Sequence, residues 1–473
     1  MIAALVLAGG GVAAWLLSDS GGDSENATAK PGPAAPTEPV KAQIKPPRAA
    51  PALKEAWTAS VPPGDTLESK PLGMWHTGSS LYVGRGTGVQ ILDMADGRVV
   101  GSVAPPKQGM AVCGMTETPN GSGLGAIAWS TKVGAYNAAC NQVSLVDTRQ
   151  GGKVVWTTEF HGTKKDGSPF DTDETRLGFI GEDLLAVMTP NTVVALRTAD
   201  RSQAWTWQNP TTQAGLWSNE SFRTTPDRVV VSMSFGASVF RKNYSVAAID
   251  AAGQPLWDVP TSVPAPEDGT VRLVSARPLT AVIEPSTLKD EQAAQLVVFD
   301  DTGKIARTIP LRGDFGKVES YGESMYGTLH APAMHVRGNT MYALTEREIG
   351  QGLSPSQAIA FDLDTGTVRW VKPASQNRDS VLIDADEEGA YVLDVASRTA
   401  STLTRFAPDG TATQVSTVAQ PKNPMGMGMQ DIGRLENGHL VMFSGLASIG
   451  VTVYGPSTST GPSTSTGPTA PTG

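Results

Sequence analysis

Methionine residues at regular spacing are the first feature of this sequence that could do chemistry. In NPMGMGMQDIG, residues 423–433, methionine alternates with glycine, and Met427 and Met429 stand at the centre. Gly-Met pairs recur far away in the chain at Met74 and Met110. Thioether sulfurs can hold Cu(I), and flexible methionine side chains can also fill gaps in a core or contact varied partners. These interpretations stay open until the elements that carry the residues are placed.

Other catalytic or metal-binding patterns in the sequence are weak. The five histidines form no HExxH metalloprotease motif, and the sequence contains no G-x-S-x-G nucleophile motif. DADEEGAY, residues 384–391, resembles the start of a calcium loop, but Val395 stands where a bidentate glutamate is required. The sequence therefore predicts no catalytic residue, no metal site and no bound cofactor.

Cys113 and Cys140 are the two cysteines of the chain. A pair of cysteines in an exported protein indicates one disulfide. The alternative is two small buried residues without a bond. We predict the disulfide.

An internal repeat with a period of roughly 50 residues must position these side chains. Its clearest copy, AIAFDLDTGTVRW, matches the pattern A-x-D-x-x-T-G-x-x-x-W. The matching residues are Ala360, Asp362, Thr365, Gly366 and Trp370. The aspartate-to-glycine segment is typical of a hairpin turn, because glycine supplies a positive φ and aspartate can bond the turn backbone. The tryptophan begins an outer strand and can fill the seam between neighbouring sheets.

Degenerate copies of this repeat recur along the chain. The tryptophan is kept at Trp156, Trp205 and Trp257. One four-stranded unit cannot bury both of its faces, whereas a ring of such units can. The pattern therefore predicts an all-β protein built as a β-propeller, with four antiparallel strands in each blade.

The A-x-D-x-x-T-G-x-x-x-W pattern resembles the tryptophan-docking motif of the pyrroloquinoline-quinone-like (quinoprotein alcohol dehydrogenase-like) propeller repeats. That superfamily includes quinoprotein dehydrogenases and the propeller lipoprotein of the β-barrel assembly machinery. The resemblance extends over residues 53–455 and implies a propeller fold. Quinoprotein dehydrogenases usually carry adjacent cysteines beside the quinone, which this sequence lacks. The resemblance therefore favours a non-catalytic member similar to the assembly lipoprotein.

The copies predict an eight-bladed propeller, with seven blades as the alternative. The last copy, residues 439–455, stops before its outer strand. LKEAWTASV, residues 53–61, can supply that strand with Trp57 in the docking position, and so close the ring without an open edge. Closure makes the last, first and second blades neighbours, which predicts a ligand-contact patch at the channel mouth. The residues of this predicted patch are Met74, Met110, Met427 and Met429.

Outside the predicted propeller the sequence changes character. Residues 1–17 are apolar and uncharged, which is typical of a signal anchor or a signal peptide. Residues 18–52 are a linker rich in Pro, Ala and Gly, and residues 456–473 repeat STSTGP as a disordered tail. We therefore expect a single-pass protein of the cell membrane with its propeller, residues 53–455, on the extracytoplasmic side.

The net charge and the predicted fold together limit the classes of function. The formal net charge of −9 argues against a nucleic-acid partner, which needs a basic footprint. We expect a monomeric, non-catalytic propeller that binds a protein, peptide or cell-envelope polymer on a face or in its channel, as a scaffold or sensor. The alternatives are a quinone-dependent oxidoreductase, which the resemblance implies, and a Cu(I)-handling protein that uses the methionine patch. The fold alone does not choose among them.

Overall fold

The computed structural model describes most of the chain between residues 52 and 456. The described ranges are 52–59, 73–85, 88–131, 140–163, 169–170, 175–209, 216–238, 241–258, 260–265, 269–285, 294–319, 334–346, 356–374, 379–395, 400–419, 432–436, 438–443 and 451–456. The predicted segment 1–17, and nearly all of the predicted linker and tail, lie outside these ranges.

The first part of the described chain forms four-stranded antiparallel sheets in simple sequence order. The first sheet contains β2 (Gly73–Thr77), β3 (Ser80–Arg85), β4 (Gly88–Asp93) and β5 (Val99–Val103). The second contains β6 (Ala111–Met115), β7 (Leu124–Ser130), β8 (Cys140–Asp147) and β9 (Lys153–Glu159). The third contains β12 (Arg176–Ile180), β13 (Leu184–Met188), β14 (Thr192–Arg197) and β15 (Gln203–Gln208). The fourth contains β16 (Leu216–Thr225), β17 (Arg228–Ser238), β18 (Arg241–Asp250) and β19 (Thr261–Val263).

The later strands continue this order and then form one larger sheet. One sheet contains β20 (Thr270–Ala276), β21 (Leu279–Glu284), β22 (Gln295–Phe299) and β23 (Ile305–Pro310), and the next contains β26 (Met334–Arg337), β27 (Thr340–Leu344), β28 (Gln357–Asp362) and β29 (Val368–Pro373). The eight-stranded sheet contains β30 (Asp379–Asp386), β31 (Gly389–Val395), β32 (Ser401–Phe406), β33 (Ala412–Val418), β1 (Ala52–Ala59), β36 (Val451–Pro456), β35 (His439–Phe443) and β34 (Ile432–Glu436) in that order.

Smaller elements complete the described structure. They are the hairpins β10 (Gly162–Thr163) with β11 (Pro169–Phe170) and β24 (Arg312–Gly313) with β25 (Gly316–Lys317), and the 3₁₀ turn η1 (Thr148–Gln150). The predicted all-β class is confirmed.

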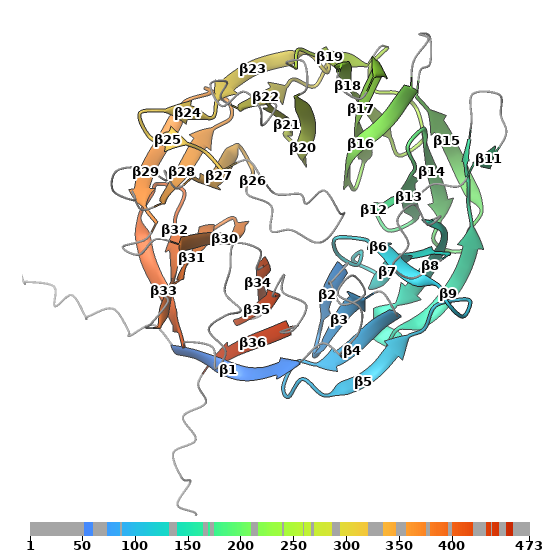
Figure 1. Ribbon diagram of the computed structural model, residues 1–473, viewed down its shortest axis with the longest axis horizontal. Coiled ribbons are helices and arrows are strands. Elements are labelled where there is room, and N and C mark those ends of the chain that lie inside the picture. The colour runs from blue at the N-terminus through green and yellow to red at the C-terminus, as the bar shows by residue number, and fades with distance from the viewer. Residues whose placement is uncertain are drawn as a thin grey trace, which may run out of the picture. The chain divides into compact units, whose positions relative to one another are not determined.

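The sheets of residues 52–456 follow one another around a ring (Figure 1). Their first strands lie side by side toward the centre: β12 contacts β16, β16 contacts β20, β20 contacts β26, and β26 contacts β30. Each sheet packs its faces against the sheets before and after it, so hydrophobic clusters fill the seams between sheets. This arrangement is a β-propeller.

Burial follows strand position within each sheet. The second strands β13 (LLAVM) and β27 (TMYAL) are buried along their whole length, because both of their faces meet a neighbouring sheet. Such strands are continuous apolar runs and do not alternate with polar residues. The outer strand β23 (IARTIP) is exposed at most positions. The sequence therefore encodes each sheet as an apolar middle with a polar outer edge.

The N-terminal strand β1 joins the two ends of the ring. It pairs antiparallel with β36 and parallel with the end of β33, where the Ala419 amide also donates to the Leu53 carbonyl at 2.9 Å. Trp57 of β1 is 7% exposed and packs with Leu81 of β3 and Val453 of β36. A segment far away in sequence thus supplies the strand that the last repeat lacks.

Tryptophan side chains fasten one sheet to the turn of the next. In each case the indole N–H donates to a backbone carbonyl just after the third strand of the following sheet. The bonds are Trp57 to Met94 (2.8 Å), Trp156 to Thr198 (2.8 Å), Trp205 to Ala251 (2.9 Å), Trp257 to Asp301 (3.3 Å) and Trp370 to Pro408 (3.1 Å). Most of these tryptophans follow a β-bulge, which re-aims a side chain. The register shifts lie directly before Trp57, Trp156, Trp205 and Trp370.

Elsewhere among the described strands, neighbouring sheets are fastened without this tryptophan. Gly101 holds the equivalent place after the bulge in β5, and Tyr82 of β3 donates its hydroxyl to the Thr148 carbonyl at 2.8 Å. Arg307 of β23 donates to the carbonyl of Asp364. At the seam before β1 the chain has no hairpin turn for a tryptophan to contact, because β36 and β1 are not joined in sequence, and the parallel pairing of β33 with β1 takes over.

The turns of the repeat are shaped by the aspartate that the motif contains. Asp362 accepts from the amides of Asp364 (2.9 Å) and Thr365 (2.8 Å). Its second oxygen pairs with Arg369 at 2.8 Å. The Thr365 amide and the Arg369 side chain together outweigh desolvation and hold the pKa of Asp362 below its ordinary value. Gly366 follows with φ +75°, as a turn of this kind requires.

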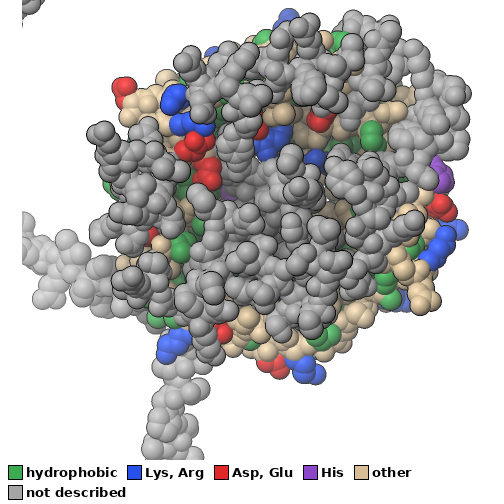
Figure 2. Space-filling view, viewed as in Figure 1, with side chains coloured by type: hydrophobic (Ala, Val, Ile, Leu, Met, Phe, Trp, Pro, Cys, Tyr) green, Lys and Arg blue, Asp and Glu red, His purple; other side chains and the backbone are tan. Residues whose placement is uncertain are grey.

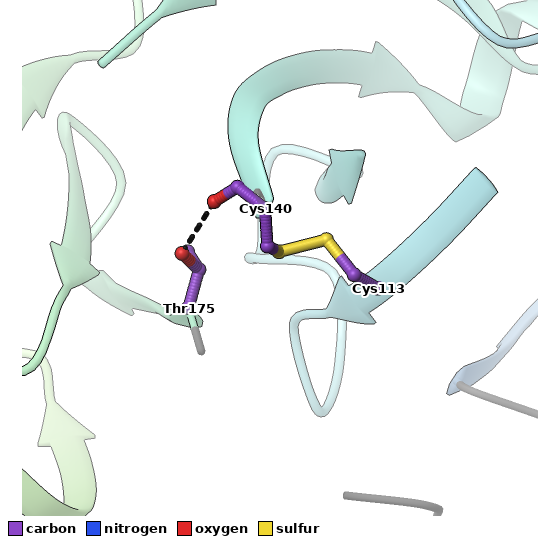
Figure 3. Close-up of a disulfide and its surroundings, with 3 residues drawn as sticks. All are labelled: Cys113, Cys140 and Thr175. Carbon is purple, nitrogen blue, oxygen red and sulfur yellow. Dashed lines mark hydrogen bonds between the residues drawn. A yellow bond between two sulfur atoms is a disulfide. The ribbon is translucent and has the colours of Figure 1, made fainter. Parts of the chain in front are cut away.

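The predicted disulfide between Cys113 and Cys140 is confirmed (Figure 3). Cys113 is the extra residue of a bulge in β6, which turns its side chain toward the start of β8. The Thr175 hydroxyl donates to the Cys140 carbonyl at 2.7 Å, so the following sheet holds this strand as well. Closing a loop between cysteines 27 residues apart is worth about 3 kcal/mol through the unfolded state.

The predicted localisation, a single-pass protein of the cell membrane with an extracytoplasmic propeller, needs correction. No helix in the described ranges is long and apolar enough to cross a membrane. The apolar segment 1–17 that suggested the anchor is at the short limit for a span and lies outside the described residues. The membrane anchor is therefore withdrawn.

Gly97 and Gly78 allow a matched test of the closing contact. Both have positive φ, +74° and +58°, so alanine strains the backbone at either position. A Cβ at Gly97 would lie 2.5 Å from the Trp57 ring, whereas a Cβ at Gly78 would meet nothing within 4 Å. We expect Gly97→Ala to lower the free energy of unfolding by about 1–3 kcal/mol more than Gly78→Ala does, the usual cost of overpacking. Urea denaturation of both variants measures this, and equal losses would contradict the contact.

Candidate functional site

The structure places the two described methionines of the predicted patch in different hydrophobic clusters. Met74 is 1% exposed and packs in the cluster with Trp57, at the closing seam. Met110 is 4% exposed and packs in another cluster with Trp129, at the next seam. Met427 and Met429 lie outside the described residues. The two described sulfurs therefore belong to separate cores and do not form one thioether group.

Met115 explains why glycine stands at position 73, in the first Gly-Met pair, and at position 84, its strand partner. Its side chain occupies the space where a Cβ of Gly73 or of Gly84 would stand. Two paired residues of β2 and β3 thus lack side chains because a methionine from the next sheet lies against them. This is a packing role, in which methionine fills an irregular gap.

A cavity of about 400 Å³ opens between the first two sheets, on the face that carries the β2–β3 turn. Its lining residues are Trp75, His76, Thr77, Thr118, Pro119, Asn120, Gly121, Gly123, Thr148 and Arg149. We call this the turn-face pocket. Its volume falls within the range of small-ligand sites.

The floor of the turn-face pocket is held by two aromatic side chains. Trp75 is fully buried and donates its indole N–H to the Thr116 carbonyl at 2.7 Å. Tyr82 lies with its ring 6.0 Å from that of Trp75 and donates to Thr148. A Cβ at Gly125 would meet the Trp75 ring at 2.5 Å, so this position must be glycine. The floor is therefore rigid.

One wall of the pocket is the loop before β7, which is held from two sides. The Thr148 hydroxyl donates to the Gly123 carbonyl at 2.7 Å. From the third sheet, Glu182 accepts from the amides of Gly121 (3.0 Å) and Ser122 (2.6 Å). Hydrogen bonding from the Ser122 side chain, and then from these two amides, holds the pKa of Glu182 below its ordinary value. The loop is thus fixed by groups from two different sheets.

A second part of the wall, next to this loop, is η1, which presents Arg149. Asp147 caps this turn and accepts from the Arg149 amide at 2.9 Å and from the Gln150 side chain at 2.7 Å. Burial opposes this ionisation, but the hydrogen bonds from Gln150 and Arg149 outweigh it and hold the pKa of Asp147 below its ordinary value. The Arg149 side chain is 63% exposed, and its Nε is 3.5 Å from Asp147. It therefore offers a cation at the mouth of the pocket.

The pocket combines an aromatic floor with polar groups on its walls. His76, Asn120 and Arg149 can donate hydrogen bonds there, and loop backbone completes the lining. Such a surface can hold a polar or acidic side chain of a partner, while the buried Trp75 and Tyr82 support the lining from below. No group of three or more His, Cys, Asp or Glu residues that could hold a metal occurs among the described residues.

Sequence reasoning missed this pocket and the residues that shape it. Tyr82, Glu182 and Arg149 come from three sheets, and each looks ordinary within its own strand or turn. The proline and glycines of TETPNGSG, residues 116–123, were the only local sign of a shaped loop. Elsewhere, on the face viewed in Figure 2, described acidic and basic side chains are interspersed and hydrophobic ones are scattered.

A known family model matches the later part of the ring. Residues 242–422 match the family model described as outer membrane protein assembly factor BamB. This stretch belongs to the pyrroloquinoline-quinone-like propeller repeats. The predicted resemblance is thereby confirmed, and the match includes the clearest docking motif, Asp362 to Trp370. No curated protein matches the chain.

Solved structures with similar folds are distant in sequence. Quinohemoprotein alcohol dehydrogenase ADHIIG from Pseudomonas putida HK5 is 11% identical over 85% of this chain and 76% of its own, with a TM-score of 0.46. The RRP9 WD40 repeats are 10% identical over 86% of this chain and 98% of their own, with a TM-score of 0.41. The dihydro-heme d1 dehydrogenase NirN is 11% identical over 72% and 65%, with a TM-score of 0.42.

Glu182 gives the pocket loop a pH dependence that can be tested. Because its pKa is lowered on folding, its contribution to stability is present above the ordinary value of 4.5 and is lost as pH falls through the lower folded value. We expect the wild type to lose more thermal stability than Glu182→Gln when the pH is lowered from 6 through this range, as followed by thermal unfolding.

Glu159→Gln serves as the control for this prediction, because Glu159 is an exposed carboxylate on β9 of the second sheet, the sheet that carries the pocket loop. Its curve should follow that of the wild type. Parallel pH profiles for the wild type and Glu182→Gln would show that the hydrogen bonds to Glu182 do not hold the loop.

Proposed function

We propose that this chain is a non-catalytic β-propeller that binds a segment of another protein, with the turn-face pocket as a contact site. The observation that carries the proposal is the rigid frame of the pocket, in which groups from three sheets fix the loop and the floor around a polar lining. A preorganised surface loses little entropy on binding. The matched family model is named for an assembly factor, which supports a protein partner.

We also propose that the ring has eight blades within residues 53–455. The six separate four-stranded sheets supply six. The eight-stranded sheet supports two more, because its pairing changes from antiparallel to parallel where β33 meets β1. The second of these blades then consists of β34, β35, β36 and β1.

Of the alternatives, the structure offers a specific observation on Cu(I) handling. Met74 and Met110 lie in different cores, whereas a Cu(I) site needs sulfurs that converge on one metal ion. For quinone chemistry we find no favouring arrangement in the part of the chain that is described. Protein binding is therefore the function that we put forward.

Arg149 and Arg98 give a matched test of the proposed function. Both lie on turns between third and outer strands, both pair with a nearby aspartate, and their side chains are 63% and 70% exposed. Only Arg149 lines the pocket. We expect Arg149→Ala to reduce the yield of partner captured by a photo-crosslinker at Asn120, in the cells that make the protein, because a charged contact is lost. Arg98→Ala should leave that yield unchanged.

A second position controls for non-specific capture. Lys304 lies on an exposed turn of the fifth sheet, far from the pocket in sequence and outside its lining. A crosslinker there should not capture the same protein, as read by mass spectrometry of the crosslinked peptides. Equal capture from Asn120 and Lys304, or a yield that is insensitive to Arg149→Ala, would contradict the pocket as a contact site.

A further inference from the structure

Arg85, the last residue of β3, is a buried cation. Its side chain is 4% exposed, and its Nε and Nη1 have no hydrogen-bond partner in the described part of the chain. Burial lowers the pKa of its guanidinium. Other arginines with a buried, unpartnered nitrogen differ from Arg85, because each of them also pairs with a carboxylate.

The contrast with those other arginines is informative. Arg228, Arg272 and Arg405 each have an unpartnered Nε as well. Each of them, however, pairs with a carboxylate through another nitrogen: Asp227, Glu284 and Glu388, respectively. Of these four arginines, three have a carboxylate partner, and no such partner for Arg85 occurs among the described residues.

The position of Arg85 follows from the alternation of β3. β3 pairs with β4 without a bulge from Ser80 to Arg85, so Arg85 points to the same side as Leu81 and Val83. Leu81 and Val83 pack in the cluster of the closing seam, with Trp57 and Val451. Arg85 therefore lies at one end of the seam between the first sheet and the sheet that β1 completes.

The turn-face pocket lies at the other end of the same strands. Thr77, which lines the pocket, pairs with Ser80 at the start of β3, and Arg85 stands at the end of β3. The two places are thus separated by the length of the strand. Whatever binds at one does not touch the residues of the other.

The chemistry of arginine decides what such a position can hold. Guanidinium stays protonated at all ordinary pH values and carries only donors, so it cannot relieve its burial by losing a proton. A buried charge without a counter-charge is strongly unfavourable, and a site of low polarity strengthens its attraction for an anion. Carboxylate, phosphate and sulfate oxygens match the planar donor fork.

We propose that Arg85 is the binding residue of an oxyanion site at this end of the closing seam, which takes the carboxylate, phosphate or sulfate group of a ligand. Bound there, the anion neutralises the guanidinium and satisfies its donors. Because the residue packs against the seam that β1 closes, the anion also stabilises the closed ring.

Titration of the full-length protein with sodium sulfate tests this site. We expect calorimetry to show saturable binding of one sulfate per chain for the wild type, with the affinity lowered by at least about tenfold in Arg85→Met, because the charge-assisted bonds are lost. Arg98→Met is the matched control, since it removes an exposed arginine of the same sheet, and it should bind sulfate as the wild type does. Sodium chloride at equal ionic strength corrects for salt effects.

Two further arms identify the chemical class and keep the test decisive. Inorganic phosphate and acetate replace sulfate in parallel titrations, and the tighter of the two indicates a phosphate or a carboxylate ligand. Unchanged sulfate affinity in Arg85→Met would overturn the proposal. Should that variant fail to fold, the wild type decides alone: absence of saturable binding for all three anions would overturn it equally.

Discussion

A closed ring of sheets must bring its first and last sheets together, and in this protein a single N-terminal strand completes the last sheet so that it packs against the first. The hydroxyls of Thr58 and Thr452 lie 3.1 Å apart although 394 residues separate them in sequence. An unpaired edge at this point would expose backbone donors and acceptors and invite association with other chains. Every other seam is made between sheets that are neighbours in sequence, whereas this seam brings together the first and the last sheet of the ring. The remaining sheets can pack on both faces only when this ladder forms.

The seams show one geometric solution reached with different residues. A donor on most of the sheets bonds a carbonyl at the turn of the next sheet, and this donor is indole in most places but phenol at Tyr82 and guanidinium at Arg307. A bulge before the docking position aims the side chain along the seam. The feature common to these seams is therefore a hydrogen bond from a side chain of one sheet to the turn after the third strand of the next sheet. The same contact fixes the turns on one face of the ring, where the candidate pocket lies.

Much of this fold could be predicted from the sequence, and the failures have physical causes. The closing strand was predictable because the last repeat stops before its outer strand, and residues 53–61 offer a strand with Trp57 in the docking position. The disulfide was predictable from the cysteine count. The roles of Tyr82 and Arg307 were not, because their partners lie on the next repeat and their own neighbourhoods carry no motif. The predicted methionine patch was misleading for Met74 and Met110, since both residues are buried gap-fillers, a role that spacing cannot separate from a surface one. The pocket and Arg85 depend on contacts between sheets, which no single stretch of sequence reveals.

The central claim is that β1 is an integral strand of the ring. Native-state hydrogen exchange of the full-length protein tests it most directly, by comparing the backbone amides of β1 and β36 with those of β13 and β14 in the third sheet. The closed ring predicts that both groups exchange only on global unfolding, with the same free energy. Exchange of the β1 amides at a much lower free energy, while β13 stays protected, would show that β1 opens on its own and would contradict the claim.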